Sequence, residues 1–457
     1  MKIKTSLKIG ISGVRGIVGE SLTPQLCAAM AQAFGTYVGG GTVILGRDSR
    51  TSGEMIKGAV LSGLLSVGCR PVDIGICPTP SIMIYTREAR ASGAIEITAS
   101  HNPKEWNGLK FINSEGLFLN GIQVKEFLDI YHQGEFSLAG VDKQRPVKRV
   151  ADPTKPHLEK LFSYFDVESI RKRRFKVAVD CANGAGAVLS RRFLEELGCT
   201  VAAINEIPDG AFAHPPEPLP ENITELCRKV TAEEADVGFV QDADADRLAV
   251  VNEKGEPMGE DMTLVLAVRH ILGQRRGTVV TNLSASRAID DVAAEFGVPV
   301  VRTRIGEINV VERMCALGGE VAVGGEGNGG VIIPAIHPCR DSFTAMAVIL
   351  EAMAKTSLTV SQLAEKAPAY CLVKAKIPGS REEASRLVRQ LKKRYEGKAL
   401  LNSDDGLKLD FPGYWLHVRP SNTEPIIRVF AEARTRAAAE DALGAFTREI
   451  EEIMAWK

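Results

Sequence analysis

The chain has 457 residues, enough for about three domains at the usual ~100–200 residues each, and its 45% hydrophobic and 25% charged residues are typical of a globular protein. Lys and Arg number 56 and Asp and Glu 57, and this near balance argues against a general nucleic-acid binder, which needs a basic surface. No apolar stretch reaches the ~18 residues of a membrane span, no signal-peptide core follows the N-terminus, and the nine cysteines include no CxxC pair, so we expect a cytoplasmic protein without a disulfide framework or zinc site.

The first predicted helix begins at Thr23-Pro24, where a capping hydroxyl precedes a first-turn proline. A strand–helix–strand pattern then occurs three times, over residues 43–75, 177–205 and 279–303. Each copy has a β-branched apolar run, a polar loop, an amphipathic helix, a glycine and a second apolar run, which predicts a parallel strand pair with a right-handed crossover. Three copies favour three related α/β units over one large sheet.

Beyond residue 369 the repeat disappears, and a mixed strand-and-helix segment predicts a smaller α+β domain. Proline-rich and polar stretches mark the expected limits between the units. We expect four domains, over residues 1–150, 151–255, 256–368 and 369–457.

A predicted strand over residues 94–97 leads into a polar loop that contains Ser100 and His101 and is closed by Pro103. Ser, Asn and Pro also favour an ordinary turn, so the loop alone does not decide between a turn and a site. A serine that accepts a phosphoryl group needs nearby cations or a metal, and Lys110 follows within a few residues. No GxSxG elbow is present, so an α/β-hydrolase triad is not indicated.

Three carboxylates at a spacing of two, Asp242, Asp244 and Asp246, stand between two apolar runs. In a curled loop they can converge on one cation, and without a cation their repulsion would be unfavourable. Glu253 falls at the twelfth place of an EF-hand pattern, but Arg247 occupies the glycine place, so we reject an EF-hand. Few hard oxygen ligands favour Mg²⁺, and Arg247 adds a cation suited to a phosphoryl group.

The segment 323–330 carries Glu326 and Asn328 among five glycines. Glycines allow close backbone approach to a ligand, and the two polar side chains suit sugar hydroxyls. A tight turn between strands is the alternative. The segment is not a dinucleotide fingerprint, because an acid intrudes and a strand pattern follows it.

Near the C-terminus a loop stiffened by Pro420 and Pro425 offers a cradle for a phosphate, and a surface turn is the alternative reading. Its candidate ligands are Arg419, Ser421, Asn422, Thr423 and, a little further on, Arg428.

Taken in order, these segments resemble the α-D-phosphohexomutase family. The motifs are IGISGVRG at 9–16, TASHNP at 98–103, DADADR at 242–247, GEGNGG at 325–330 and RPSNTEP at 419–425. The chain departs from the family pattern at Ile11, where Thr is commoner, and at Ala243, where Gly is usual. The resemblance covers residues 9 to about 430, and its serine and aspartate motifs together are highly specific.

The resemblance implies three α/β domains with mixed sheets and a C-terminal α+β domain around a central cleft. It implies a phosphorylated Ser100 and a Mg²⁺ ion bound by Ser100 and the three aspartates, so that two loops ~140 positions apart meet. Family roles in handling the transferring phosphate or proton carry over to Arg15, Lys110 and Arg247, with His101 beside them. Glu326 and Asn328 would contact sugar hydroxyls, and the C-terminal loop would bind the distal phosphate.

The implied reaction interconverts 6-phospho and 1-phospho sugars through a 1,6-bisphosphate intermediate. Lys110 is the candidate general base, on the condition that burial near Arg247 lowers its pKa. Asn328 stands where many relatives have Ser, and Gly330 where some phosphomannomutases and phosphoglucomutases have His. The GEGNGG form is similar to that of archaeal-type phosphoglucosamine mutases, which favours glucosamine phosphate.

A dual-specificity phosphomannomutase/phosphoglucomutase is the alternative. A metal-dependent sugar phosphatase and a non-catalytic phosphosugar-binding protein are more distant possibilities. The expected partner is a small phosphosugar, with no nucleic acid and no membrane, and the protein is expected to be a monomer or homodimer.

Overall fold

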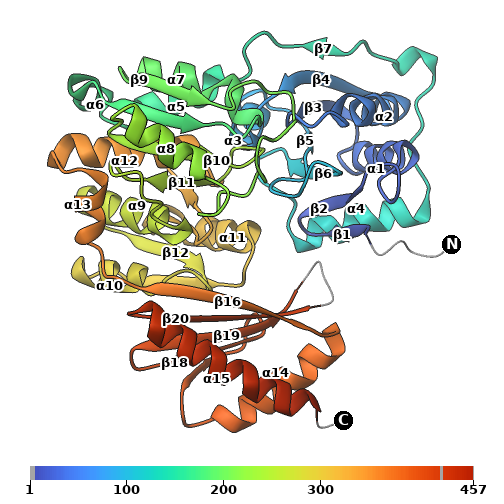
Figure 1. The fold of residues 1–457 in the computed structure, drawn as a ribbon. Helices are drawn as coiled ribbons and strands as arrows, with labels where there is room; N and C mark the ends of the chain where they lie inside the picture. Colours follow the sequence, from blue (N-terminus) through green and yellow to red (C-terminus); the bar gives the residue numbers. More distant parts are fainter. Residues whose placement is uncertain (1–5, 422–425, 456–457) are drawn as a thin grey trace.

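The computed structural model describes residues 6–421 and 426–455, and these form four β-sheets that follow one another along the chain (Figure 1). The first three sheets are mixed and are packed with helices, and the fourth is antiparallel. The predicted fold class, three α/β units followed by an α+β unit, is confirmed. Within the described residues, no helix combines the length and the apolar character of a membrane span.

The first sheet has the strand order β1-β2-β6-β5-β3-β4-β7. Its strands are β1 Lys8–Gly10, β2 Gly13–Ile17, β3 Gly41–Arg47, β4 Cys69–Ile76, β5 Gly93–Ile97, β6 Trp106–Asn113 and β7 Lys148–Arg149. Its helices are α1 Pro24–Tyr37, α2 Gly53–Ser66, α3 Thr79–Glu88, α4 Gly121–Gln133 and the short η1 Val141–Lys143. Thr23 caps α1 as predicted, since its Oγ1 accepts from the Leu26 amide. Phe34 of α1 packs against Phe111 and Phe127 in the core of this unit.

The second sheet has the order β11-β10-β8-β9 and the third the order β13-β12-β14-β15. The second unit contains α5 Lys155–Tyr164, α6 Val167–Arg173, β8 Lys176–Asp180, η2 Ala185–Val188, α7 Ser190–Glu196, β9 Thr200–Ile204, α8 Thr224–Ala232, β10 Val237–Gln241 and β11 Leu248–Val251. The third contains α9 Glu260–Gln274, β12 Thr278–Asn282, α10 Ala288–Glu295, β13 Val300–Thr303, α11 Glu307–Leu317, η3 Gly318–Glu320, β14 Val321–Glu326, β15 Gly330–Ile332, α12 Ser342–Thr356 and α13 Val360–Glu365.

The three predicted repeats correspond to the pairs β3–β4, β8–β9 and β12–β13, and each pair is parallel. The helices α2, α7 and α10 connect the two strands of each pair. Parallel strands put their carboxyl ends at one edge of a sheet, so the polar loops that follow these strands gather there. The prediction of three separate sheets with a common unit is therefore confirmed.

The second and third units share one continuous hydrophobic core. Phe193 of α7 packs edge-on against Phe343 of α12, with ring centroids 5.5 Å apart. Every residue of α12 from Ser342 to Met353 is buried, and the helix lies between elements of both units. These two units therefore form one packed body.

A buried polar chain joins the first three units. His157 Nδ1 of α5 lies 2.8 Å from Ser81 Oγ of α3, and its Nε2 lies 2.9 Å from Asp341 Oδ2, the N-cap of α12. The spacing is that of a Ser-His-Asp triad, but all three side chains are buried away from any substrate. We read this chain as a structural connection, since a fully satisfied buried network fixes the elements that carry it.

The fourth unit is a five-stranded antiparallel sheet of order β16-β20-β19-β18-β17. Its elements are β16 Cys371–Pro378, α14 Arg381–Tyr395, β17 Leu400–Asn402, β18 Leu407–Phe411, β19 Tyr414–Pro420, β20 Ile426–Ala433 and α15 Arg436–Ala455. Both helices pack on this sheet over a separate core. Arg287 of the third unit bonds Asp410 Oδ1 and main-chain oxygens of this unit, and Ser284 Oγ lies 2.9 Å from His417 Nδ1.

Candidate active site

Ser100 lies at the carboxyl end of β5, and its backbone has a φ of 51°, in the left-handed region. A residue with a Cβ is strained there, so the surrounding contacts must hold it. Its amide donates to Thr98 Oγ1 at 2.9 Å, and its side chain is only 2% exposed. The predicted polar loop is therefore a constrained loop and not a surface turn.

Arg50, which the sequence interpretation did not single out, supports this loop through hydrogen bonds. Its guanidinium donates to the main-chain oxygens of Ser100, Asn102, Pro103 and Trp106. Its Nε bonds Asp48 Oδ2 at 3.0 Å, and that oxygen also accepts from Thr98 Oγ1 at 2.7 Å. The signal in the sequence was the charged segment 47–50, which directly follows the first strand of the first repeat.

The aspartate run forms the loop between the antiparallel strands β10 and β11. One oxygen from each of Asp242, Asp244 and Asp246 lies within 4.8 Å of the others, and all three side chains are fully buried. Asp242 Oδ1 accepts from the amides of Asp246 and Arg247, which curls the loop. The predicted convergence of the three carboxylates is thus found.

Two oxygens of this group, Asp244 Oδ1 and Asp246 Oδ1, are buried without a hydrogen-bond partner. A buried carboxylate oxygen without a donor is costly, and a bound cation removes that cost. Three carboxylates, two of which have an oxygen without a hydrogen-bond partner, are the hard ligands that Mg²⁺ takes. The residues present therefore fit a divalent cation.

The serine loop and the aspartate loop meet. Ser100 Oγ lies 3.2 Å from Asp242 Oδ2 and 3.4 Å from His101 Nδ1. The Thr79 amide at the start of α3 donates to the main-chain oxygen of Asp244 at 2.9 Å. The first and second units are thus in contact around one hydroxyl and three carboxylates.

Lys110 of β6 lies beside this group, with Nζ 2.6 Å from Asp244 Oδ2 and 3.4 Å from Glu96 Oε2. Burial alone would lower the pKa of Lys110, but the attraction of Asp244 and Glu96 outweighs it, and the pKa is raised. The lowered pKa that we expected of Lys110 is therefore not found. Burial likewise opposes ionisation of Asp244, and Lys110 overcomes it and lowers the pKa of that carboxyl. Burial and the other two aspartates raise the pKa of Asp242.

Two further predicted cations surround the serine. Arg15 Nη1 donates to Asn102 Oδ1 at 3.2 Å, and Arg247 Nε lies 3.7–3.8 Å from the carboxylates of Asp242 and Asp246. The Nε atoms of both arginines are buried without a hydrogen-bond partner. Burial, with Arg247 and Arg15 nearby, lowers the pKa of His101 well below its ordinary value. The group can therefore accept an anion beside Ser100.

Glu326 ends β14 and faces the same group from the third unit. It accepts hydrogen bonds from Asn282 Nδ2, the Gly306 amide and Arg340 Nη1, each at 2.9 Å. Burial opposes ionisation of Glu326, but Arg340 and Asn282 overcome it and its pKa is lowered. The loop is a hairpin in which Glu326 pairs with Gly330, and Asn328 Oδ1 is buried without a partner. The tight turn and the candidate sugar-binding side chains, which were alternative readings of the sequence, therefore occur in the same segment.

Arg340 is the second functional candidate that the sequence interpretation missed. It bonds Asp246 Oδ2, Glu326 Oε2 and Glu307 Oε2, and so it connects the aspartate loop to the glycine-rich loop. The signal was Arg340 next to Asp341, a helix N-cap residue, before a long apolar run.

The C-terminal candidates form a separate group on the fourth sheet. Arg419 of β19 and Arg428 of β20 lie directly opposite each other, and Ser421 follows β19. Arg419 Nε bonds Asp405 Oδ1 at 3.1 Å, while Asp405 Oδ2 accepts from the Ile305 amide of the third unit at 3.0 Å. Ile305 precedes Gly306, whose amide bonds Glu326, so the turn at 305–306 connects the C-terminal candidates with the glycine-rich loop. The candidates Asn422 and Thr423 lie outside the described residues.

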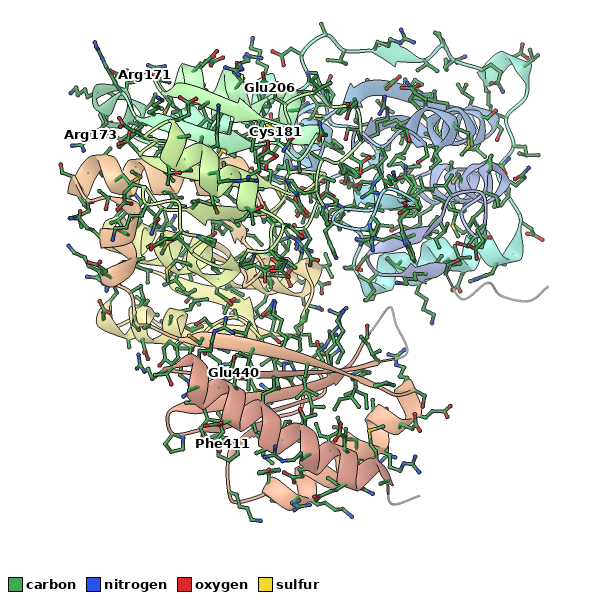
Figure 2. All side chains as sticks on the ribbon, in the orientation of Figure 1. Arg171, Arg173, Cys181, Glu206, Phe411 and Glu440 are labelled. Atoms are coloured by element: carbon green, nitrogen blue, oxygen red, sulfur yellow. The ribbon has the colours of Figure 1, made fainter. Side chains whose placement is uncertain are left out.

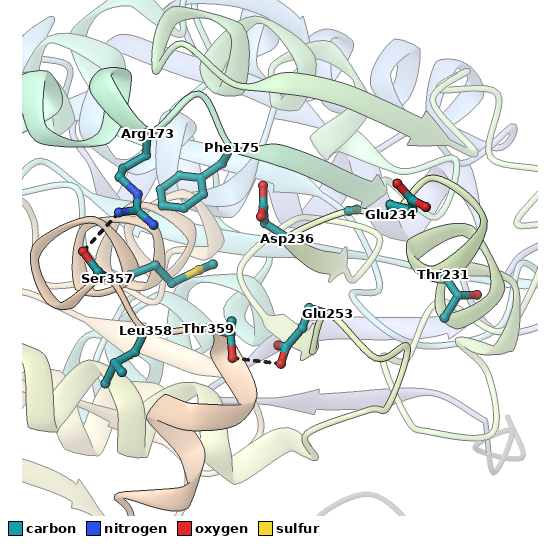
Figure 3. Close-up of a pocket in the computed structure, with 11 residues that line it drawn as sticks. Arg173, Phe175, Thr231, Glu234, Asp236, Glu253, Ser357, Leu358 and Thr359 are labelled. Carbon is teal, nitrogen blue, oxygen red and sulfur yellow. Dashed lines mark hydrogen bonds between the residues drawn. The ribbon is translucent and has the colours of Figure 1, made fainter.

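Glu253, at the twelfth place of the rejected EF-hand pattern, is not one of the converging acids. It accepts from Thr359 Oγ1 at 2.8 Å on the wall of a separate surface pocket of about 360 Å³ (Figure 3). Arg173 and Phe175 line the same pocket, which shares no residue with the groups around Ser100. Figure 2 draws the described side chains as sticks and labels Arg173 of this pocket, the last residue of α6.

Comparison with known families identifies four consecutive matches. They are phosphoglucomutase/phosphomannomutase α/β/α domain I over residues 6–137, domain II over 155–255, domain III over 259–370 and the C-terminal domain over 372–449. Solved structures agree with the fold. A phosphoglucomutase/phosphomannomutase family protein from Burkholderia thailandensis superimposes with a TM-score of 0.84 at 24% identity, covering 99% of this chain and 98% of that one.

An N-acetylphosphoglucosamine mutase from Aspergillus fumigatus, solved with GlcNAc-6P and magnesium, has a TM-score of 0.57 at 16% identity and covers 98% of this chain and 95% of that one.

Two archaeal relatives are similar over nearly their whole length. A phosphoglucomutase/phosphomannomutase from Thermococcus kodakarensis is 38% identical over 97% of this chain and 98% of its own. A probable phosphoglucosamine mutase from Methanopyrus kandleri is 37% identical over 94% of this chain and 95% of its own. With all four family domains matched in order, the chain belongs to the phosphoglucomutase/phosphomannomutase family.

Proposed function

We propose that this chain is a phosphohexomutase that interconverts 6-phospho and 1-phospho sugars through a phosphorylated Ser100 and a sugar 1,6-bisphosphate. The observation that carries this proposal is Ser100 Oγ at 3.2 Å from Asp242 Oδ2, in a buried trio of acids 142 positions away. A hydroxyl held against carboxylates that need a cation suits phosphoryl transfer, in which charge on the transferring oxygens must be offset.

Ser100 and the three aspartates would hold Mg²⁺, and the fit of their free oxygens supports this assignment. When bound, the ion supplies Lewis-acid stabilisation of the transferring phosphoryl group. Magnesium in the Aspergillus mutase supports the choice of metal.

The chain's own residues would carry out the transfer in two steps. The phosphoryl group on Ser100 Oγ passes to a free hydroxyl of the bound monophosphate; that hydroxyl gives up its proton, Ser100 Oγ takes one up, and the sugar then carries two phosphates. After the bisphosphate turns over in the site, Ser100 Oγ gives up its proton and takes the other phosphoryl group, and the sugar oxygen that releases this group regains a proton. Arg15 and Arg247 would bind the transferring group, because the Nε atoms of their buried guanidinium groups have no hydrogen-bond partner. We assign Lys110 to holding Asp244, since its pKa is raised, and His101 to orienting Ser100 Oγ.

Substrate binding would use two regions. Glu326 and Asn328 would contact the sugar hydroxyls, and the unpartnered Asn328 Oδ1 supports that role. The distal phosphate would bind at the C-terminal loop, where Arg419 and Arg428 are paired across two strands. Ser421, Asn422 and Thr423 complete the proposed loop. A cradle of hydroxyls and guanidinium groups can accept a phosphate on either sugar carbon.

We propose glucosamine 6-phosphate to glucosamine 1-phosphate as the main reaction, which the GEGNGG loop and the name of the Methanopyrus relative support. The alternative, a phosphomannomutase/phosphoglucomutase, has the support of the Thermococcus relative's name. We further propose a cytoplasmic monomer or homodimer.

The test combines mass and activity. Purified protein should carry one phosphoryl group that is lost in Ser100→Ala, and that variant should have no mutase activity. Coupled assays with the 6-phosphates of glucosamine, mannose and glucose would rank the substrates. Release of inorganic phosphate without a 1-phosphate product would show a phosphatase and contradict the mutase. Full activity of Ser100→Ala would contradict the phosphoserine.

A further inference from the structure

Arg340 is a buried cation, 8% exposed, that three acids from three different segments surround. Its Nη2 bonds Asp246 in the β10–β11 loop, its Nη1 bonds Glu326 at the end of β14, and its Nε bonds Glu307 at the start of α11. The Arg340 amide also donates to Glu307 Oε1 at 2.9 Å. The side chain therefore has one donor for each segment.

Only a guanidinium fits this arrangement. Its planar fork presents donors in fixed directions, whereas a lysine ammonium is a single point charge and would reach fewer of these oxygens. Gly330 makes room for it, because a Cβ added at Gly330 would overlap Arg340 Cδ and lie 2.9 Å from its Cγ. Gly330 therefore leaves the space that the Arg340 side chain occupies.

The role of Arg340 follows from which carboxylate oxygen of each acid it bonds and which it leaves to other groups. It bonds Asp246 Oδ2 and leaves Asp246 Oδ1, which lies 3.7 Å from Arg247 Nε, without a hydrogen-bond partner among the three converging acids. On the other side it takes Glu326 Oε2, while Asn282 and the Gly306 amide take Oε1. One side chain therefore fixes both a candidate metal ligand and the candidate sugar-binding acid.

We propose that Arg340 is a positioning residue that couples divalent-metal binding at the aspartate trio to sugar binding at Glu326. This inference rests on the proposed function. A metal ion that orders Asp246 also orders the guanidinium, and through it Glu326, so the sugar meets an acid that is already oriented. By linkage, the sugar must tighten metal binding by the same factor.

The experiment measures that factor without turnover. In a Ser100→Ala background, Mn²⁺ is titrated by electron paramagnetic resonance with and without saturating glucosamine 6-phosphate, or whichever of the three hexose 6-phosphates binds tightest. We expect the sugar phosphate to tighten Mn²⁺ binding by about fivefold or more, the lower end of ordinary coupling. Adding Gly330→Ala, which keeps the arginine but displaces it, or Arg340→Lys should reduce the factor to nearly one.

Gly273→Ala is the matched control, because a methyl group there meets nothing within 4 Å, and it should keep the parental factor. General damage would weaken both ligands and preserve their ratio, so an undiminished factor in Gly330→Ala overturns the role of Arg340. If the Ser100→Ala parent binds neither Mn²⁺ nor any of the sugar phosphates, the proposed function fails together with this inference. If the unmodified enzyme has mutase activity but Gly330→Ala keeps the full coupling factor, the proposed function stands and only the coupling role of Arg340 is rejected.

Discussion

Ser100 carries a Cβ in a backbone conformation that favours glycine, which costs about 1–3 kcal/mol and requires support from the surroundings. The support is Arg50, whose guanidinium binds four main-chain oxygens of the loop and the buried Asp48. The position of the proposed nucleophile is therefore supported by a side chain that bonds main-chain oxygens of the loop and Asp48.

Arg50→Met should destabilise the protein by about 3–5 kcal/mol, because it leaves Asp48 as an uncompensated buried charge. Urea denaturation of the variant and the wild type measures the difference. Arg436→Met serves as control, since Arg436 pairs with Glu440 on the surface, and its cost should stay below about 1 kcal/mol. Equal losses of unfolding free energy in the two variants would contradict the supporting role of Arg50.

Single residues differed in how far the sequence could predict them. The aspartate trio was predictable because three carboxylates between two apolar runs have few alternatives to a cation site. Arg50 and Arg340 were not, since their partners lie in other loops that only the fold brings near. The condition set for Lys110 as general base, a pKa lowered by burial near Arg247, is not met, because Asp244 and Glu96, the residue opposite Lys110 on β5, raise its pKa.

At the scale of elements, the docking of β19 on the third unit depends on a neutral histidine. His417 lies between Ser284 Oγ and the main-chain oxygen of Asp405. Burial lowers the pKa of His417 from 6.5 to about 4, although Asp405 opposes the shift. The unfolded chain therefore binds a proton between pH 6.5 and pH 4 that the folded chain excludes, and stability falls as the pH falls through this window.

His417→Gln should remove this dependence. At about 1.36 kcal/mol per pH unit, the unfolding free energy of the wild type relative to His417→Gln should fall by about 3 kcal/mol from pH 7 to pH 4. Urea titrations at four pH values test it. For the control Gln133→Ala, which changes an exposed residue without a titrating group at the end of α4, the difference from the wild type should not vary with pH. A constant difference for His417→Gln would contradict the assignment.

The elements themselves were largely predictable. The strand–helix–strand copies could be recognised from their apolar runs and the glycines that end their helices, and all three form parallel strand pairs. The family resemblance implied mixed sheets, but it did not identify the antiparallel pairs: β5 pairs with β6, β10 with β11 and β14 with β15, and the loop within each pair carries candidate site residues. Hairpin pairing depends on contacts between whole strands, which local patterns do not reveal.

At the scale of the molecule, the fourth unit has its own core and contacts the third through polar side chains that include Arg287. That side chain bonds Asp410 Oδ1 and the main-chain oxygens of Phe411 and Tyr414. We therefore expect the position of the proposed phosphate loop relative to the serine loop to depend on this interface.

Arg287→Ala should loosen this interface and raise KM for the sugar phosphate about tenfold, which corresponds to about 1.4 kcal/mol. Amide hydrogen exchange should increase in β18 and β19, while β3 and β5 in the first sheet keep their protection. Arg276→Ala, an exposed arginine of the same unit that stacks on Phe296, is the control and should leave both measures unchanged. An unchanged KM in Arg287→Ala would show that the interface does not position the loop.

The shared core of the second and third units has a consequence for synthesis. Asp246 of the second unit is held by Arg340, and Gln241, just before the acids, bonds Ser342 at the start of α12. A nascent chain that has not yet released α12 from the ribosome therefore leaves Asp246 without Arg340, and the second unit lacks the part of the shared core that α12 supplies. The candidate ion site is completed only when about three-quarters of the chain has been translated, so we expect the second unit to finish folding together with the third.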